Sequence, residues 1–229
     1  MFISIVVPTK DEEIHIGNLL DSVQMQEYNK GLFDVTVVDS GSDGTLEVVE
    51  KFQDSMEIKI FRTKCGVGTA RNIGAGAAKG DVILFADADV ELPYNILKET
   101  AKEFSKDKEL ISLAFPILPS RENSIANVFR KPQNLFCKYS IKHTKSPYIA
   151  GTCCAYRKSL FEQLHFLDCA GEDVLFSIQA GNFGKSKYMR DLIVYEDPRR
   201  FERHGFVRTF IHYVPGTTRG LSNFAKARF

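Results

Sequence analysis

Residues 70–89 read ARNIGAGAAKGDVILFADAD, and this stretch contains the features that decide the fold. The small side chains of residues 67–80 predict a helix that can lie unusually close to a sheet or to a ligand, and Gly80 is expected to end that helix. The apolar run at residues 82–86 is typical of a central strand that is buried on both faces. Two aspartates follow this strand directly.

The same alternation of strand and helix extends to both sides of this stretch. Further strands are predicted at residues 2–7, 35–38, 58–61 and 110–115. Apolar helical stripes are predicted from Ile16, Leu19, Leu20 and Val23, from Thr45, Val48, Val49 and Phe52, and within residues 94–105. Asp11, or Thr9 paired with Glu12, is expected to cap the first of these helices. The pattern predicts an α/β domain with a parallel sheet covered by helices.

The pattern becomes less regular after residue 115. Residues 116–147 are interrupted by proline and rich in Lys and Arg, so we expect either a mobile flap or an acceptor-side insertion, with a helix near residues 123–129. Regular structure resumes with a strand and then a helix in residues 149–164, and with a loop and then a helix in residues 170–184. A strand at residues 187–195 precedes a basic tail.

Composition excludes several classes of protein. The chain has 229 residues, of which 44% are hydrophobic and 26% charged, which is typical of a globular domain. Lys and Arg number 30 against 29 Asp and Glu, so the net charge of +1 supplies no global field for nucleic acid or for an anionic membrane, and any basic site must be local. We therefore expect no nucleic-acid partner.

The cysteines and the N-terminus indicate a reduced, cytoplasmic setting. Five cysteines are an odd number without a CxxC pair, so we interpret them as small buried apolar groups. The start MFISIVVPTKDEE lacks the features of a secretory signal, and no apolar run approaches about 18 residues. We expect no transmembrane segment, and peripheral contact with the cytoplasmic membrane surface stays open.

Polar residues follow three of the predicted strands. Ligands of an open parallel sheet bind beyond the carboxyl ends of its strands, so these three sets are expected to share one crevice. The sets are Pro8, Thr9 and Glu12, then Asp39, Ser40 and Asp43, then Asp87 and Asp89.

Asp87 and Asp89 are two residues apart, which places both carboxylates on one side of an extended chain. Two hard oxygen ligands suit Mg²⁺ or Mn²⁺, ions that keep positions open for water and a substrate diphosphate. A loop or helix-capping role is the alternative for this D-x-D pair.

The segment VVDSGSDGT admits two interpretations. Asp39 at the tip of its strand is placed to accept hydrogen bonds from a base or a ribose. The alternative is a turn, with Asp43 capping the next helix, and for Asp43 this is the favoured interpretation. The first strand is followed by neither G-x-G-x-x-G nor a P-loop, which argues against a dinucleotide fold.

Four motifs together resemble the family 2 glycosyltransferases, which have the GT-A fold. They are VVPTKDEE, VVDSGSDGT, ARNIGAGAAKGDVILFADAD and GEDVLFSIQAGNFG, in the family's order and spacing over residues 3–185. The resemblance implies a Rossmann-like mixed sheet with helices on both faces, in a single domain at residues 1–229. It also implies a nucleotide-sugar-binding half at residues 1–115 and an acceptor-binding half at 116–229 that ends in the basic tail.

The resemblance further implies transfer, with inversion, of a sugar from a nucleotide diphosphate donor to an acceptor hydroxyl. The donor is expected to be a UDP- or GDP-sugar, and the acceptor a glycan, a lipid-linked molecule or a small molecule. The implied nucleotide-binding residues are Pro8, Thr9, Glu12, Asp39, Arg71 and Asp87. Asp89 is implied as the main ligand of the divalent metal, with Asp87 near it.

In the same family pattern Asp173 is the catalytic base and Glu172 orients the base or the acceptor. The alternative is a purely structural role, in which both residues cap a helix that begins at VLFSIQA. This role can coexist with catalysis.

The basic tail contains a cluster of arginines. Arg199, Arg200 and Arg203 suit the donor diphosphate or a phosphorylated acceptor, and a solvated basic face is the alternative. His204 is a candidate to complete the metal shell, although a lone histidine is more often structural. The tail is similar to that of compact, stand-alone family members without a membrane segment.

Two other functions compete with transfer. A sugar-phosphate nucleotidyltransferase would carry a glycine-rich loop with a basic residue where this chain has PTKDEE. A non-catalytic nucleotide-sugar or glycan-binding module on the same fold would not need Asp39, Asp89 and Asp173 together.

Overall fold

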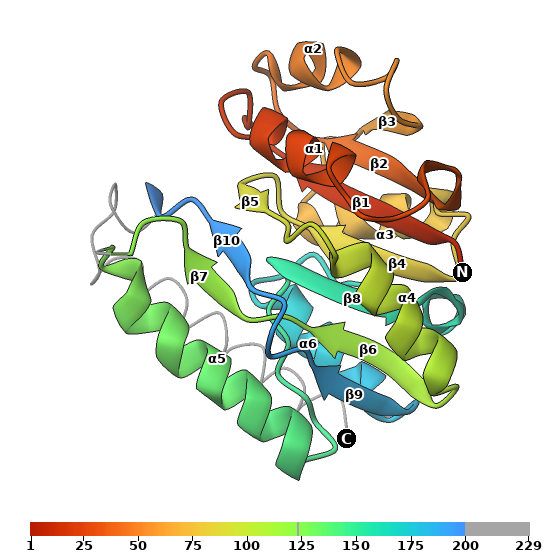
Figure 1. The fold of residues 1–229 in the computed structure, drawn as a ribbon, viewed down its shortest axis with the longest axis vertical. Helices are drawn as coiled ribbons and strands as arrows, with labels where there is room; N and C mark the ends of the chain where they lie inside the picture. The colour runs from red at the N-terminus through yellow and green to blue at the C-terminus, as the bar shows by residue number, and fades with distance from the viewer. Residues whose placement is uncertain (123, 200–229) are drawn as a thin grey trace.

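The computed structural model describes residues 1–122 and 124–199 and shows a mixed α/β fold (Figure 1). The strands are β1 (Ile3–Thr9), β2 (Phe33–Asp39), β3 (Ile58–Arg62), β4 (Val82–Ala86), β5 (Val90–Glu91), β6 (Leu110–Ala114), β7 (Ile117–Pro119), β8 (Cys153–Arg157), β9 (Lys185–Tyr188) and β10 (Val194–Glu196). The α-helices are α1 (Ile16–Gln24), α2 (Thr45–Glu50), α3 (Val67–Ala77), α4 (Ile96–Lys106), α5 (Ala126–His143) and α6 (Glu172–Ala180), and two 3₁₀ turns span Lys30–Leu32 and Lys158–Glu162.

The strands form a large sheet and a small one. The order in the large sheet is β3-β2-β1-β4-β8-β6-β9, and the order in the small sheet is β5-β10-β7. In the large sheet β8 is antiparallel to both of its neighbours, whereas the other pairs are parallel. The predicted mixed central sheet is therefore confirmed, and the carboxyl ends of β1, β2 and β4 meet at one edge.

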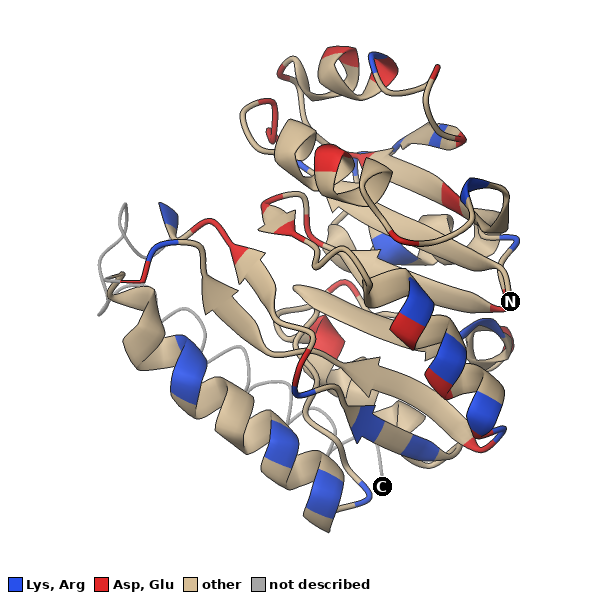
Figure 2. Ribbon diagram, viewed as in Figure 1, with Lys and Arg blue, Asp and Glu red and all other residues tan. Residues whose placement is uncertain are grey.

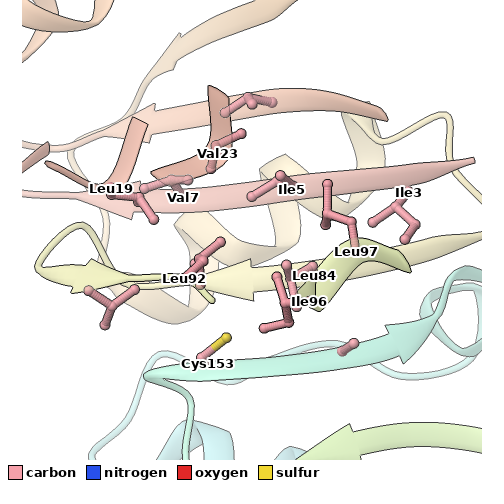
Figure 3. Packing of buried hydrophobic residues seen from close by; sticks show 14 of the residues in the cluster. Ile3, Ile5, Val7, Leu19, Val23, Leu84, Leu92, Ile96, Leu97 and Cys153 are labelled. Atoms are coloured by element: carbon pink, nitrogen blue, oxygen red, sulfur yellow. The ribbon is translucent and has the colours of Figure 1, made fainter. Parts of the chain in front are cut away.

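Each face of the large sheet has its own hydrophobic core. Along β4, Leu84 belongs to the cluster under α1, α2 and α4, whereas Phe85 belongs to the cluster that includes Cys137 of α5 and Phe176 of α6. Figure 3 shows the first cluster, in which Leu19 of α1 and side chains of β1 and β4 lie together. Successive residues alternate between faces because side chains of a strand point to opposite sides. The sequences of β1 and β4 are apolar along most of their length because both faces of these strands are buried.

Helix α3 packs on β1 through its small residues. A Cβ built on Gly74 would lie under 3.0 Å from Val6 Cγ1, so only glycine allows this approach. The helix ends at Ala77, three residues before the predicted end. Its backbone becomes extended at Ala78, and the next two backbone N–H groups bind the hydroxyl of Ser4. Bonding to β1, rather than a glycine cap, ends this helix.

The predicted caps of α1 are wrong. Helix α1 has His15 at its N-cap position and no side-chain capping bond. Thr9 instead ends β1, and the Asp11 carboxylate accepts a hydrogen bond from the backbone N–H of Ser42. Asp43 binds the backbone N–H and hydroxyl of Thr45, the first residue of α2, whereas Gly44 occupies the N-cap position of this helix.

The segment after residue 115 is more regular than predicted. Instead of a short helix at 123–129, it contains the 18-residue helix α5, with Pro132 on its exposed side. Asn134 holds this helix against β7, because its side chain binds both the N–H and the carbonyl of Ile117. Such long-range contacts offset the loss of one helical hydrogen bond at proline.

Two further predictions in the C-terminal half need correction. The single strand predicted at residues 187–195 is divided between β9 in the large sheet and β10 in the small sheet, with a turn at Arg190 and Asp191. The helix expected at the end of residues 149–164 is a short 3₁₀ turn. The local sequence pattern could not reveal that the chain passes from the large sheet to the small sheet between β9 and β10.

The cysteines only partly follow the expectation. Cys137, Cys153 and Cys154 are buried, whereas Cys65 is exposed and Cys169 is half-buried. Burial raises the pKa of the Cys137 thiol to about 12. Among the described helices, none has the length and hydrophobicity that crossing a bilayer requires.

The packing of α3 on β1 gives the first testable prediction. Gly74→Ala should lower the free energy of unfolding by about 1–3 kcal/mol, because the added methyl overlaps Val6. Gly76→Ala in the same helix is the control, since nothing lies within 4 Å of its Cβ, and it should stabilise by about 0.5–1 kcal/mol. Urea denaturation measures both, and equal effects of the two variants would contradict this packing.

Candidate functional site

A cleft of about 600 Å³ opens at the carboxyl edge of the large sheet. It receives residues from the ends of β1 and β4, from the N-terminus of α3, from α5 and from the N-terminus of α6. The predicted site residues that line it are Pro8, Thr9, Glu12, Arg71, Asp87, Asp89, Glu172 and Asp173. Segments that are far apart in the sequence thus converge on one cavity, as the strand-end argument predicts.

Asp39 lies beneath the cleft wall. It is buried, and its Oδ1 accepts a hydrogen bond of 2.7 Å from the Thr9 hydroxyl and one of 3.2 Å from the backbone N–H of Gly41. The adjacent Ser40 lines the cleft. The parallel register of β1 and β2 places Thr9 opposite Asp39, which explains how two strand ends form one corner of the site.

Asp87 and Asp89 both line the cleft and have different partners. Asp87 pairs with Arg71 at 3.1 Å, and Asp89 lies 3.5 Å from Arg199 Nη2. Ala88 between them is buried in the hydrophobic core. The alternation expected for a D-x-D pair after a strand therefore holds in this structure.

Arg71 is a buried charge of the site. Its guanidinium pairs with Asp87 and Glu172 and donates a hydrogen bond of 3.3 Å to the carbonyl of Gly151. Burial lowers the pKa of Arg71, but the carboxylates of Asp87, Glu172 and Asp173 outweigh it, so the net shift is upward. Arg71 is thus a fixed cation whose charge is balanced within the protein.

Asp173 lies at the N-terminus of α6, where backbone donors hold its carboxylate. Oδ2 accepts a hydrogen bond of 2.6 Å from the N–H of Gly151, and Oδ1 accepts one of 2.8 Å from the N–H of Val174. A Cβ on Gly151 would lie 2.7 Å from Arg71 Nη2 and 2.9 Å from the Asp173 Cβ. Gly171 precedes α6 with a φ of 77°, a conformation that favours glycine. The two glycines therefore fix where Asp173 enters the cleft.

Glu172 has an unusual protonation equilibrium. Burial and the neighbouring charge of Asp173 raise its pKa to about 7, and Arg71 opposes this shift without cancelling it. A carboxyl group with such a pKa carries a proton for part of the time near neutral pH.

The basic tail is only partly visible. Arg199 pairs with Glu12 and approaches Asp89, so it lies against two of the predicted site residues. The predicted roles of Arg200, Arg203 and His204 concern positions outside the described residues.

Carboxylates outnumber basic side chains in the lining of the cleft. Its lining includes the carboxylates of Glu12, Asp87, Asp89, Glu172 and Asp173 and the basic side chains of Lys10, Arg71 and Arg130. Arg71 and Arg130 are already paired within the protein. No group of three His, Cys, Asp or Glu side chains arranged to hold a metal occurs within residues 1–122 and 124–199. Asp87 and Asp89 each present a carboxylate, a hard-oxygen group, to the cleft.

Sequence reasoning missed the wall that α5 contributes. Arg130 forms a buried ion pair with Glu196 of β10, and its Nη1 also binds the side chain of Gln133. Gln133 in turn donates a hydrogen bond of 2.9 Å to the Tyr148 hydroxyl. Arg130, Gln133 and Tyr148 all line the cleft. The Lys/Arg-rich composition of this segment was visible in the sequence. Which of its side chains face the cleft depends on the rotation of the helix, which the sequence did not reveal.

Comparison with known families gives one match over most of the chain. The family described as "Glycosyl transferase family 2" matches residues 4–165. This segment includes all strand-end residues of the cleft from β1, β2 and β4.

Curated relatives match parts of the chain. Poly(ribitol-phosphate) beta-N-acetylglucosaminyltransferase TarS of Staphylococcus aureus (strain Mu50 / ATCC 700699) is 36% identical over 105 residues, which is 44% of this chain and 18% of TarS. Glycosyltransferase AglE of Haloferax volcanii is 37% identical over 92 residues, which is 38% of this chain and 30% of AglE. The chain thus spans less than a third of the length of these two relatives. An uncharacterized glycosyltransferase of Haemophilus influenzae is 25% identical over 98% of both chains.

Solved structures share the fold. TarS residues 1–349 of S. aureus, in complex with UDP-GlcNAc, superpose with a TM-score of 0.73 and 25% identity over 86% of this chain and 58% of that one. The mannosyltransferase PcManGT of Pyrobaculum calidifontis, in complex with GDP-Man and Mn²⁺, gives a TM-score of 0.77 and 20% identity over 98% and 64%. These neighbours confirm the predicted GT-A fold.

The raised pKa of Glu172 gives the second prediction. Between about pH 4.5 and 7 the folded protein retains a proton that the unfolded chain has released. The free energy of unfolding should therefore fall as the pH rises through this window, by roughly 1–3 kcal/mol. Glu172→Gln should remove this part of the slope, whereas Glu162→Gln on the exposed surface should keep it. Urea denaturation at several pH values in metal-free buffer measures the slope, and a wild-type slope in Glu172→Gln would contradict the assignment.

Proposed function

The chain belongs to glycosyl transferase family 2, and from this premise we propose that its cleft transfers a sugar from a nucleotide diphosphate donor to an acceptor hydroxyl. One observation carries the proposal. Asp87 and Asp89 after β4 face the same cavity of about 600 Å³ as Glu172 and Asp173 at the start of α6. The cavity therefore presents one pair of carboxylates for the leaving diphosphate and a second pair for the acceptor hydroxyl.

The nucleotide is assigned to the corner formed by the ends of β1 and β2. The hydroxyl groups of Thr9 and Ser40 line this corner and suit the polar edges of a base or ribose, and the buried carboxylate of Asp39 accepts a hydrogen bond from the Thr9 hydroxyl behind them. The relative TarS, with 36% identity over 105 residues and a structure in complex with UDP-GlcNAc, supports a UDP-sugar as the donor.

The diphosphate needs positive charge in a cleft with this many carboxylates. Arg71 and Arg130 are balanced by their own partners, so they offer little free charge. We assign Asp89, with Asp87 beside it, to hold Mg²⁺ or Mn²⁺, which would neutralise the charge that develops on the leaving diphosphate. Arg199 lies 3.5 Å from Asp89, and Lys10 lines the same cleft.

Asp173 is assigned as the base. Two backbone donors orient its carboxylate, and each oxygen keeps a lone pair for the acceptor hydroxyl. In the proposed step the hydroxyl oxygen forms a bond to the anomeric carbon while its proton passes to Asp173. The bond from that carbon to the phosphate oxygen breaks, and its electron pair remains on the diphosphate. A single displacement of this kind inverts the anomeric configuration. Glu172 is a positioning residue, since it holds Arg71 next to the base.

A panel of donors tests the function as a whole. UDP-, GDP-, CMP- and dTDP-sugars are compared by thermal shift, with and without Mn²⁺, and by release of the nucleotide. We expect the largest shift and measurable release with a UDP-sugar and metal, because a ligand that binds only the folded state raises its stability. A shift without any release from any donor would instead indicate a binding module.

The base assignment gives the third prediction. Asp173→Asn should bind the donor as the wild type does and should lower the rate of donor turnover by about 10²–10⁴-fold, because the amide cannot accept the proton. Asp54→Asn makes the same change at an exposed position outside the cleft and serves as the control. Nucleotide release at the wild-type rate from Asp173→Asn would refute the assignment.

The metal assignment gives the fourth prediction. Asp89→Ala should lose the additional thermal shift that Mn²⁺ contributes to donor binding, because the main carboxylate ligand is absent. Glu91→Ala, two residues along the chain and not in the cleft lining, should retain it. Titration of Mn²⁺ followed by calorimetry gives a second measurement, and unchanged metal affinity in Asp89→Ala would exclude Asp89 as a ligand.

A further inference from the structure

Helix α5 has an apolar outer face. Its inner side packs on β7 and lines the cleft, whereas several large apolar side chains point outward. Val128, Leu135 and Tyr139 are 62%, 68% and 58% exposed, and Phe136 is 55% exposed. The first three are spaced i, i+7 and i+11, which places them on one stripe of the helix. A stripe of this kind is unusual on a helix that faces only water.

Lysines flank the apolar stripe. Lys131, Lys138 and Lys142 have the same i, i+7 and i+11 spacing, and Lys145 follows the end of the helix. Within the described part of the chain, none of these four forms an ion pair with a carboxylate. The sequence of α5 contains no Asp or Glu, and Figure 2 shows its ribbon with blue positions and no red one.

Helix α4 shows that this charge pattern is not general. Its exposed lysines Lys98, Lys102 and Lys106 lie 2.7 Å, 2.7 Å and 4.0 Å from carboxylates of Glu27, Glu99 and Glu103. Red and blue therefore alternate along α4 in Figure 2. The positive charge of α5 is thus local and unbalanced, although the chain as a whole carries a net charge of only +1.

We propose that the outer face of α5 docks on an anionic phospholipid bilayer. A helix that combines an apolar stripe with flanking lysines lies in the plane of a membrane interface, with its apolar side chains among the acyl chains. The lysines then meet the phosphates and acidic headgroups of the lipid. The positive charge of the α5 lysines and the negative charge of the lipid headgroups are complementary, which favours an anionic bilayer as the partner of this face.

A second copy of the chain fits the same face less well. A two-fold interface would bring the α5 lysines of both copies together, and like charges would repel. An acidic protein groove would satisfy the lysines, but nothing in the stripe selects one sequence of partner side chains. A fluid anionic surface satisfies both the apolar and the cationic groups without such complementarity.

Docking on α5 would bring the cleft close to the lipid. Arg130 and Gln133, on the inner side of the same helix, line the cleft. If the cleft transfers sugars as proposed above, the acceptor that it meets is one presented at a bilayer surface. This consequence for the acceptor rests on the proposed function, whereas binding to the bilayer does not.

Vesicle flotation tests the docking without any sugar transfer. The purified protein is mixed with vesicles of phosphatidylglycerol and phosphatidylcholine in equal parts, or of phosphatidylcholine alone. We expect flotation with the anionic vesicles and much less with the neutral ones. Binding should weaken as salt shortens the Debye length from about 10 Å at 0.1 M to about 3 Å at 1 M. Equal binding to both vesicles, or to neither, would overturn the proposal.

Two α5 variants and one α4 variant locate the contact. The triple change of Lys131, Lys138 and Lys142 to Gln should weaken binding by about fivefold per lysine, or roughly a hundredfold in total. Leu135→Gln with Tyr139→Gln should weaken it through loss of apolar burial, and both variants are checked for an unchanged melting temperature. Changing Lys98, Lys102 and Lys106 to Gln removes the same charge from α4 and should leave binding unaffected.

Two results would contradict the α5 face as the contact. One is an equal loss of binding in the α4 variant. The other is a wild-type dimer, in light scattering, that dissociates when Leu135 and Tyr139 are changed. Donor thermal shifts on the same samples keep the two proposals apart, since donor binding without flotation refutes the docking alone.

Discussion

The buried guanidinium of Arg71 is the contact on which the cleft depends. It joins α3 to Asp87 after β4, to Glu172 at the start of α6 and to the carbonyl of Gly151 before β8. Removing one partner of a buried ion pair leaves a charge that costs several kcal/mol, so these segments are held at fixed mutual positions. Because Asp173 follows Glu172 and binds the N–H of Gly151, the same pairing determines where the proposed base lies.

The position of Arg71 depends in turn on the small side chains of α3. Gly74 allows the helix to contact Val6 of β1 directly, and a larger residue there would push the helix outward. The Arg71 side chain would then have to reach farther to pair with Asp87 and Glu172. The ion pairs of Arg71 therefore depend on the close packing of α3 against β1. Glycine lowers the intrinsic stability of the helix, which is the local cost of this close packing.

The N-terminal half and most of the cleft were predictable from sequence, because strand-end residues of a parallel sheet converge by geometry alone. Asp87, Asp89 and Thr9 follow from that rule. The length of α5 and the switch from β9 to β10 did not follow, because they depend on contacts distant in sequence such as Asn134 with Ile117. The wall formed by Arg130, Gln133 and Tyr148 was missed for the same reason. The pairing of Arg71 was likewise out of reach, since its partners lie 16 and 101 residues away.

The small net charge of the chain conceals two surfaces of opposite charge. The cleft gathers five carboxylates, from Glu12 to Asp173, whereas the outer side of α5 carries lysines without acidic partners among the described residues. These opposite charges cancel in the net value of +1, which excludes a global field but not local ones. Helix α5 separates the two surfaces, since it faces the acidic cleft with Arg130 and the solvent with Lys131. Consecutive residues of one helix thus face the cleft and the solvent.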